Sequence, residues 1–382
     1  MGIQAAIDTR ALSQRITSAM KPINENFFQE RALLKLAENR IKWNCSHTEF
    51  EWFVRNVPTG QTATFGNPDG ELSILTFEEQ KPVNRAHLPF CYIKKTYGVG
   101  DRTIEANRNA TDNKIFGAVK ENMQLAYIFM YDALGPSIYN KNLTSEDPVG
   151  LLAMVGNPIN TGNHAVIPAL ASYAGRTLST AGFTGSTTKG LVPSTASAWD
   201  DAQFSPTVGS VEDVLLAAGS SETKWSTGCL YILDYMAEQM SRTASTSGTG
   251  KRIKPDIALM NMGPYMAVKN LMTKSQLTYN IPLGNTSLTL ANFPNIVVNS
   301  LTCIKDTDVP SDANSTPEEI VFVMDSNQFQ ICTTHKKSEG LIKSEFDPDI
   351  VLINGVVGSL QANMAYMLNS PTAIGAVVGC GD

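Results

Sequence analysis

Histidine and cysteine, the side chains that most often bind metals or act in catalysis, are few and scattered in this sequence. The four histidines, His47, His87, His164 and His335, belong to no HExxH or HxH motif and to no group of four Cys and His residues that could bind zinc. Cys332 and His335 have the spacing of one such pair, but no second pair follows at the distance seen in zinc-binding domains. We therefore predict no metal site, with Cys332 at the end of a strand and His335 in solvent.

Motifs for phosphate binding and for nucleophilic catalysis are also incomplete. The segment Gly248-Thr249-Gly250-Lys251 resembles the end of a phosphate-binding loop. However, Arg252 stands where the motif needs Ser or Thr, and the preceding residues are typical of a helix rather than a strand. No G-x-S-x-G motif, which would present a nucleophilic serine, occurs in the sequence. We predict no catalytic residue and no cofactor, and hence a protein that is not an enzyme.

Composition limits the class of protein further. The length of 382 residues predicts two or three domains. Hydrophobic residues make up 42%, enough for a large core, whereas charged residues make up only 17%. The 30 Lys and Arg residues against 36 Asp and Glu residues give a net charge of −6. These values exclude a disordered chain and a strongly basic nucleic-acid-binding protein, and the low charge suits a surface that contacts neighbouring molecules.

The six cysteines do not form a disulfide framework. No two have the Cys-x-x-Cys spacing, so we interpret them as small, mostly buried hydrophobic residues. The first residues lack the basic and apolar regions of a signal peptide, and no apolar run reaches the roughly eighteen residues that cross a membrane. We therefore expect a protein that stays in a reducing aqueous compartment and does not bind a membrane.

Hydrophobic periodicity predicts an α+β fold without repeated β-α-β units. Short helices are expected up to Arg40, and a longer one over residues 221–241. The best-defined helix covers residues 112–134, where large apolar residues recur at spacings of three and four and Gly135-Pro136 should end the helix. Runs typical of strands lie at 257–260, 295–304, 319–325, 328–334 and 349–353.

Residues 48–100 predict a long β-ribbon. Residues 50–55 place aromatic side chains on both faces of a strand, and extended runs follow at 71–77 and 88–97. The tract at 58–70 is rich in turn-forming residues and indicates a loose tip. A ribbon of two or three strands is only marginally stable alone in water. Either the body of the same chain or a neighbouring subunit must therefore cover it.

Several short segments follow one another in a distinctive order. They are the ribbon at 48–100, Ile104-Glu105-Ala106 before the helix at 112–134, Asp147-Pro148-Val149-Gly150-Leu151-Leu152, Tyr173-Ala174-Gly175-Arg176 with the later Trp199, and residues 254–261 followed by Tyr265 and Leu271. This order, which covers most of the chain, resembles the major capsid proteins of tailed bacteriophages that have the Hong Kong 97 fold. By this resemblance, the ribbon is the family's extended loop and the helix at 112–134 is its spine helix.

The resemblance implies a domain organisation. It predicts an N-terminal arm at 1–45, an extended loop at 46–103, a peripheral domain at 104–160 with the spine helix at 112–134, an axial domain at 161–330 with a long loop at 172–210, and a return to the peripheral domain at 331–382. Some relatives join subunits through a Lys–Asn bond. Lys81 and Asn363 are the residue types required, but nothing around them favours that chemistry.

The resemblance also implies a function. It predicts a major head protein that assembles through hexamers and pentamers into the icosahedral shell around a double-stranded DNA genome, with portal and scaffolding proteins as partners. Such a protein assembles in the host cytoplasm, resides in the virion and binds DNA without sequence specificity. The acidic net charge fits this function, because an acidic wall would not hold the phosphates of the genome. The expected contacts between subunits are the apolar residues of the ribbon: Phe50, Trp52, Phe65, Leu72, Ile74, Phe77 and Tyr97.

Two other functions remain open at this point. An encapsulin-like compartment has a shell of the same fold, but it holds a protein cargo instead of a genome. A soluble hydrolase or binding domain with a lid at 172–210 is the alternative from another class, and it predicts a monomer or dimer rather than a particle.

Overall fold

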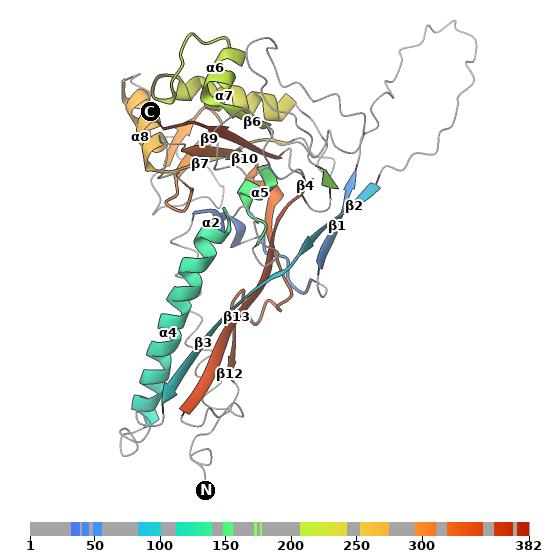
Figure 1. The fold of residues 1–382 in the computed structure, drawn as a ribbon, viewed down its shortest axis with the longest axis vertical. Coiled ribbons are helices and arrows are strands. Elements are labelled where there is room, and N and C mark those ends of the chain that lie inside the picture. The colour runs from blue at the N-terminus through green and yellow to red at the C-terminus, as the bar shows by residue number, and fades with distance from the viewer. Residues whose placement is uncertain are drawn as a thin grey trace, which may run out of the picture.

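The computed structural model of the chain describes residues 32–38, 40–45, 49–55, 83–100, 112–139, 148–155, 172–173, 176–177, 207–242, 253–274, 295–310, 319–346, 355–369 and 373–381. The architecture is α+β, as predicted (Figure 1). A body made of helices and a six-stranded sheet lies at one end of the molecule. A long helix and a second sheet extend away from that body.

The six-stranded sheet is the centre of the body. Its strands, in spatial order, are β6 (Thr207–Ser210), β14 (Ile374–Val378), β10 (Ile320–Met324), β7 (Ile257–Met260), β9 (Leu301–Lys305) and β8 (Asn295–Val298). β14 pairs with β6, and β7 with β9, in parallel, whereas the other neighbours are antiparallel. Every residue of β7, β10 and β14 is buried. The sheet is therefore covered on both faces.

Two hydrophobic clusters cover these faces. Successive side chains of a strand point to opposite faces, so Phe322 of β10 packs in one cluster while Val321 and Val323 pack in the other. The second cluster includes three helices, α6 (Val211–Ala217), α7 (Trp225–Arg242) and α8 (Met262–Lys274). One face of the six-stranded sheet and the three helices thus pack together in the second cluster.

Helix α7 confirms the apolar stripe that its sequence predicts. Five residues of the stripe are buried in the second cluster: Trp225, Cys229, Leu233, Met236 and Met240. The indole nitrogen of Trp225 donates a hydrogen bond to the carbonyl oxygen of Pro264 at 3.2 Å, which joins α7 to α8. The helix begins at Trp225 rather than at residue 221, because residues 221–224 are exposed and no apolar contact holds them in a helical turn.

The second sheet is built around one long strand, β13 (Gly355–Leu368). β11 (Phe329–Thr333) and β12 (Lys343–Phe346) pair along one edge of β13, and β3 (Cys91–Gly100) pairs along the other. Helix α4 (Asp112–Ser137) lies along this sheet, next to β3 and β13 (Figure 1). Three short elements complete the described part of the chain: α5 (Leu151–Val155), β4 (Ser172–Tyr173) and β5 (Arg176–Thr177).

Helix α4 begins where the sequence predicts but is longer at its end. Six residues of the predicted apolar face are buried: Val119, Met123, Ala126, Tyr127, Met130 and Leu134. The predicted stop at Gly135-Pro136 is wrong, because the helix continues to Ser137. Proline lacks only one backbone donor, and the last turn is held by a hydrogen bond of 2.7 Å from the Ser137 hydroxyl to the carbonyl oxygen of Leu134.

The predicted ribbon is divided between two parts of the fold. β1 (Glu49–Arg55) pairs with β2 (Val83–Pro89), but the next strand, β3, pairs with β13 instead. The predicted extended loop at 46–103 is therefore not one unit. The segment 331–382 is also divided, since β12 and β13 belong to the second sheet and β14 returns to the six-stranded sheet. The strand predicted at 349–353 lies outside the described residues, as does most of the loop predicted at 172–210, including Trp199.

The described part of the predicted N-terminal arm packs against its own chain. Leu33 and Leu34 of helix α2 (Ala32–Glu38) are buried in the first hydrophobic cluster. The guanidinium of Arg40 donates hydrogen bonds to the carbonyl oxygen of Ser326 and, at 2.8 Å, to the side-chain oxygen of Asn327. Both acceptors belong to the 3₁₀ turn η3 (Ser326–Gln328), which follows β10. This end of the arm is thus fixed to the body by apolar and polar contacts.

The turn that receives Arg40 is itself held by a buried carboxylate. Asp256, which precedes β7, accepts hydrogen bonds from the backbone nitrogen of Ser326 at 2.7 Å and from its hydroxyl at 2.6 Å. Burial raises the pKa of the Asp256 carboxyl above its usual value, and the hydrogen bonds from Ser326 oppose that shift. The carboxylate therefore orders the acceptors that Arg40 uses.

Two glycines in this fold should respond to the same substitution with opposite signs. A Cβ atom at Gly358 of β13 would lie 2.5 Å from the Cζ atom of Tyr97, whereas one at Gly117 of α4 would meet nothing within 4 Å. We expect Gly358→Ala to lower the free energy of unfolding by about 1–3 kcal/mol. We expect Gly117→Ala to raise it by about 0.5–1 kcal/mol, because alanine favours a helix. Urea unfolding of the two variants measures both changes, and a neutral Gly358→Ala would contradict the packing described here.

Candidate assembly surface

The ribbon of β1 and β2 is a two-stranded sheet with a continuous antiparallel register. Glu49 pairs with Pro89 at one end, and Arg55 pairs with Val83 at the other. Figure 1 shows this pair of strands on the side of the molecule opposite α4. The pairing of β1 with β2 ends at Arg55 and Val83, and residues 56–82 connect these two residues.

Two of the predicted contact residues attach β1 to its own chain. The rings of Phe50 and Trp52 stack with their centroids 5.8 Å apart, and both side chains are half-buried against the first hydrophobic cluster. The indole nitrogen of Trp52 donates a hydrogen bond to the carbonyl oxygen of Asn369 at 3.2 Å. The ammonium group of Lys42 lies 5.1 Å from the centre of the Phe50 ring. These two aromatics therefore hold one face of β1 on the body.

Tyr97 is not a surface residue, which corrects the prediction that it contacts a neighbouring subunit. Its side chain is only 6% exposed, and its hydroxyl lies 3.1 Å from that of Ser344 on β12. Burial raises the pKa of the Tyr97 hydroxyl. The ring covers Gly358, its partner across the β3–β13 pair, and the missing Cβ atom of this glycine makes room for the ring. The other four predicted contacts, Phe65, Leu72, Ile74 and Phe77, lie outside the described residues.

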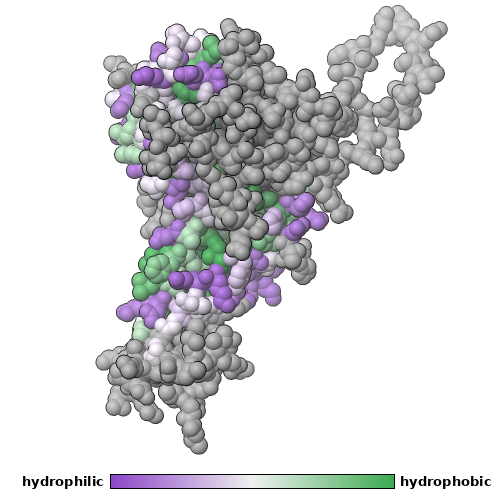
Figure 2. Space-filling model, viewed as in Figure 1, coloured by the Kyte–Doolittle hydropathy of each residue, from purple (hydrophilic) through white to green (hydrophobic). Residues whose placement is uncertain are grey.

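The exposed apolar stripe of α4 was missed in the sequence. Leu125, Ile128 and Phe129 are 53%, 54% and 58% exposed, and their spacing places them on one face of the helix. Figure 2 shows hydrophobic side chains gathered over the middle of α4. The exposed acidic residues Glu121 and Asp132 lie four positions before Leu125 and four positions after Ile128. We call Leu125, Ile128 and Phe129 the α4 stripe.

The α4 stripe is large for an exposed apolar patch. Exposed apolar residues are common singly, but three on adjacent turns of one helix form a continuous patch. A cation lies at one edge of the stripe, where the ammonium group of Lys95 on β3 is 4.9 Å from the centre of the Phe129 ring. The sequence contained a signal for this stripe, since the three residues have helical spacing outside the predicted buried face. Only the structure shows that about half of each side chain stays exposed.

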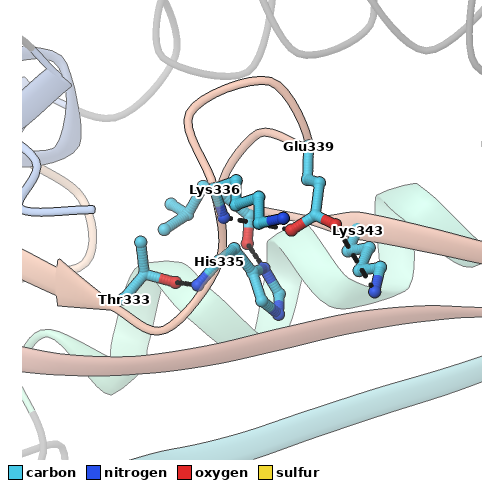
Figure 3. A network of polar contacts seen from close by, with 6 residues as sticks. Thr333, His335, Lys336, Glu339 and Lys343 are labelled. Atoms are coloured by element: carbon cyan, nitrogen blue, oxygen red, sulfur yellow. Dashed lines mark hydrogen bonds and ion pairs between the residues drawn. The ribbon is translucent and has the colours of Figure 1, made fainter. Parts of the chain in front are cut away.

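The loop between β11 and β12, which contains His335, holds a polar network (Figure 3). His335 is buried, which corrects its predicted place in solvent, and its Nδ1 atom donates a hydrogen bond to the carbonyl oxygen of Leu341 at 3.1 Å. Glu339 accepts a hydrogen bond of 3.0 Å from the backbone nitrogen of Lys336 and lies 3.6 Å from the ammonium group of Lys343. The hydrogen bond from Lys336 lowers the pKa of the Glu339 carboxyl. The network holds together the loop that joins β11 to β12, both of which pair with β13.

Neither a metal-binding group nor a membrane-spanning helix is found among the described residues. Among them, no three His, Cys, Asp or Glu side chains are grouped so that they could bind a metal ion. No helix in this part of the chain has the length and hydrophobicity needed to cross a membrane. Five of the six cysteines are buried, which confirms the interpretation of most of them as core residues.

Comparison with solved structures identifies the fold. A capsid chain of cyanophage A-1(L) is 16% identical, with 91% of this chain and 92% of that chain covered and a TM-score of 0.50. The capsid of a native GTA particle is 13% identical, with 91% and 89% covered and a TM-score of 0.49. An encapsulin from Synechococcus elongatus is 10% identical, with 77% and 75% covered and a TM-score of 0.43.

No known protein family matches the sequence, and no curated protein is similar to it. The likeness to the cyanophage chain spans nearly the full length of both chains. The chain therefore has the α+β fold of a phage capsid protein, and the Hong Kong 97-like fold predicted from its sequence is confirmed.

Proposed function

We propose that this protein is the major capsid protein of a tailed bacteriophage, whose copies assemble into an icosahedral shell around a double-stranded DNA genome. The observation that carries the proposal is the full-length likeness to a capsid chain of a cyanophage. In such a shell the chain is a structural subunit rather than an enzyme, and it resides in the virion. Hexamers and pentamers of the chain are the expected building units, with portal and scaffolding proteins as partners during assembly in the host cytoplasm.

Two surfaces of the chain support a role in assembly. The α4 stripe presents three large apolar side chains that are each more than half exposed. The ribbon of β1 and β2 leads into residues 56–82, which carry Phe65, Leu72, Ile74 and Phe77. We assign both to contacts with a second copy of the chain. Each contact can be modest, because a closed shell repeats it many times and every subunit is held by several neighbours.

The charge of the chain supports an inert wall around DNA. The net charge of −6 disfavours strong binding to phosphates, so the genome can enter and leave the shell. DNA is then held inside by enclosure, without sequence-specific contacts.

Expression of the chain in bacteria tests the proposal directly. We expect particles of uniform diameter by electron microscopy and sedimentation, either from the chain alone or with the neighbouring genes that encode a scaffold and portal. A soluble monomer or dimer under both conditions would contradict a shell function. Particles that contain a specific protein cargo and no genome would instead support the encapsulin-like alternative.

A further inference from the structure

The end of the N-terminal arm forms a short extra edge on the second sheet. Lys42 bridges to Cys332 of β11 in parallel. The backbone nitrogen of Lys42 donates to the carbonyl oxygen of Ile331 at 2.8 Å, and that of Thr333 donates to the carbonyl oxygen of Lys42 at 2.9 Å. The backbone nitrogen of Cys45 then donates to the carbonyl oxygen of Thr333 at 3.0 Å. Cys45 is thus hydrogen-bonded to the residue that follows Cys332, although the two cysteines are far apart in sequence.

The two thiols interact and differ in accessibility. Cys45 is partly exposed, whereas Cys332 is fully buried. A hydrogen bond from the Cys332 thiol is the main cause that lowers the pKa of Cys45 to about 7, with a smaller contribution from the positive charge of Lys42. This shift favours the thiolate form of Cys45, and the thiolate is the nucleophile in thiol–disulfide exchange.

The same contact keeps Cys332 protonated until Cys45 has reacted. The pKa of Cys332 is raised, first by its hydrogen bond to Cys45 and then by burial. Once the Cys45 sulfur is bonded to another sulfur, it carries no charge that would hold the proton on Cys332. The order of reaction is thus set by the site, with Cys45 first and Cys332 second.

We infer that Cys45 and Cys332 are a disulfide-forming pair that locks the end of the arm, residues 40–45, onto the second sheet when the protein meets an oxidising environment. The oxidant is a low-molecular-weight disulfide. The Cys45 thiolate attacks one of its sulfurs and releases one thiolate, which forms a mixed disulfide on Cys45. Cys332 then loses its proton and attacks the Cys45 sulfur, which releases the second thiolate. The two protein thiols are oxidised, and one disulfide is reduced to two thiols.

The chain contains a matched control pair. Cys229 of α7 and Cys303 of β9 are also near each other, but both are fully buried. The pKa of Cys303 is raised by burial and by the proximity of Cys229, so neither thiol is accessible or activated. If proximity alone were enough, both cysteine pairs would form a disulfide. If an accessible thiolate is also needed, only Cys45 and Cys332 would form one.

Oxidised glutathione applied to the folded full-length chain tests the inference. We expect the chain to lose the mass of two hydrogen atoms, and digestion without reductant to give one cross-linked peptide that contains Cys45 and Cys332. We also expect the melting temperature to rise by several degrees, because the bond closes a very long loop in the unfolded chain. Both changes should be absent in Cys45→Ser and retained in Cys229→Ser.

Other products of the same reaction would overturn the inference. A stable glutathione adduct on Cys45 without a cross-link would show that the second thiol cannot reach the first. A Cys229–Cys303 peptide, or an unmodified chain after prolonged oxidation, would show that the site is not activated. The reaction needs no assembled shell, so its outcome is separate from that of the assembly experiment.

Discussion

Replacing residues 56–82 by Asn-Gly is expected to abolish closed shells while leaving the rest of the chain folded. Arg55 and Val83 are direct partners in the β1–β2 register, so a two-residue turn can join them without disturbing the ribbon. The replacement removes Phe65, Leu72, Ile74 and Phe77, which we propose contact a neighbouring copy. Burial of one apolar side chain contributes about 1.5–3 kcal/mol to the free energy of a contact. Removing several such side chains therefore removes more free energy than a modest contact between subunits provides.

Sedimentation and electron microscopy measure the loss of shells, and circular dichroism with thermal unfolding measures the fold. A matched control keeps the length of the segment and changes only four side chains, Phe65→Ser, Leu72→Ser, Ile74→Ser and Phe77→Ser. We expect this control to fail in assembly as well, because the apolar side chains rather than the length provide the contact. Intact shells from the shortened chain would refute the role proposed for this segment.

Substitution of the α4 stripe by Ile128→Glu is expected to raise the concentration needed for assembly at least about tenfold. The side chain is 54% exposed, so glutamate does not disturb the core of the monomer. In a contact between copies it would place a carboxylate in an apolar environment, which costs several kcal/mol unless it is paired. A loss of about 1.4 kcal/mol per subunit already corresponds to a factor of ten.

Leu216→Glu provides the comparison for Ile128→Glu. Leu216 is 47% exposed on α6, and it lies apart from the α4 stripe. The same change of residue type there tests whether any exposed apolar residue matters or only the stripe. We expect both variants to unfold at the temperature of the unmodified protein, and only Ile128→Glu to assemble poorly. Equal assembly of the two variants would contradict a contact at the α4 stripe.

The two longest helices, α4 and α7, could be predicted from the sequence because each packs an apolar face onto a core. The apolar spacing of α4 and α7 is regular, and the buried faces follow it. The strands were harder, above all β13, which has Gly, Ser, Gln and Asn among its residues and no simple alternation. Its conformation depends on strands that pair along both of its edges, and a contact with β3 or β11 cannot be read from the local sequence.

The residues of the candidate assembly surface could also be predicted only in part. Phe50 and Trp52 were correctly placed on a strand of the ribbon, but one sequence cannot show that Asn369 and Lys42 hold them on the same chain. Tyr97 has the residue type of an interface contact, yet a glycine on the partner strand makes room for it in the core. The α4 stripe was missed because an amphipathic helix is expected to have one apolar face, and this one has a second.

The position of β14 affects how the protein is made in the cell. This strand lies between β6 and β10, although it follows them in sequence by many residues. At ordinary translation rates β6 waits on the order of ten seconds for β14, its one partner among the described strands, to leave the ribosome. Copies that terminate before residue 374 keep two strand edges open and attract chaperones or proteases. Chains that end early are therefore expected to be degraded rather than to accumulate as folded protein.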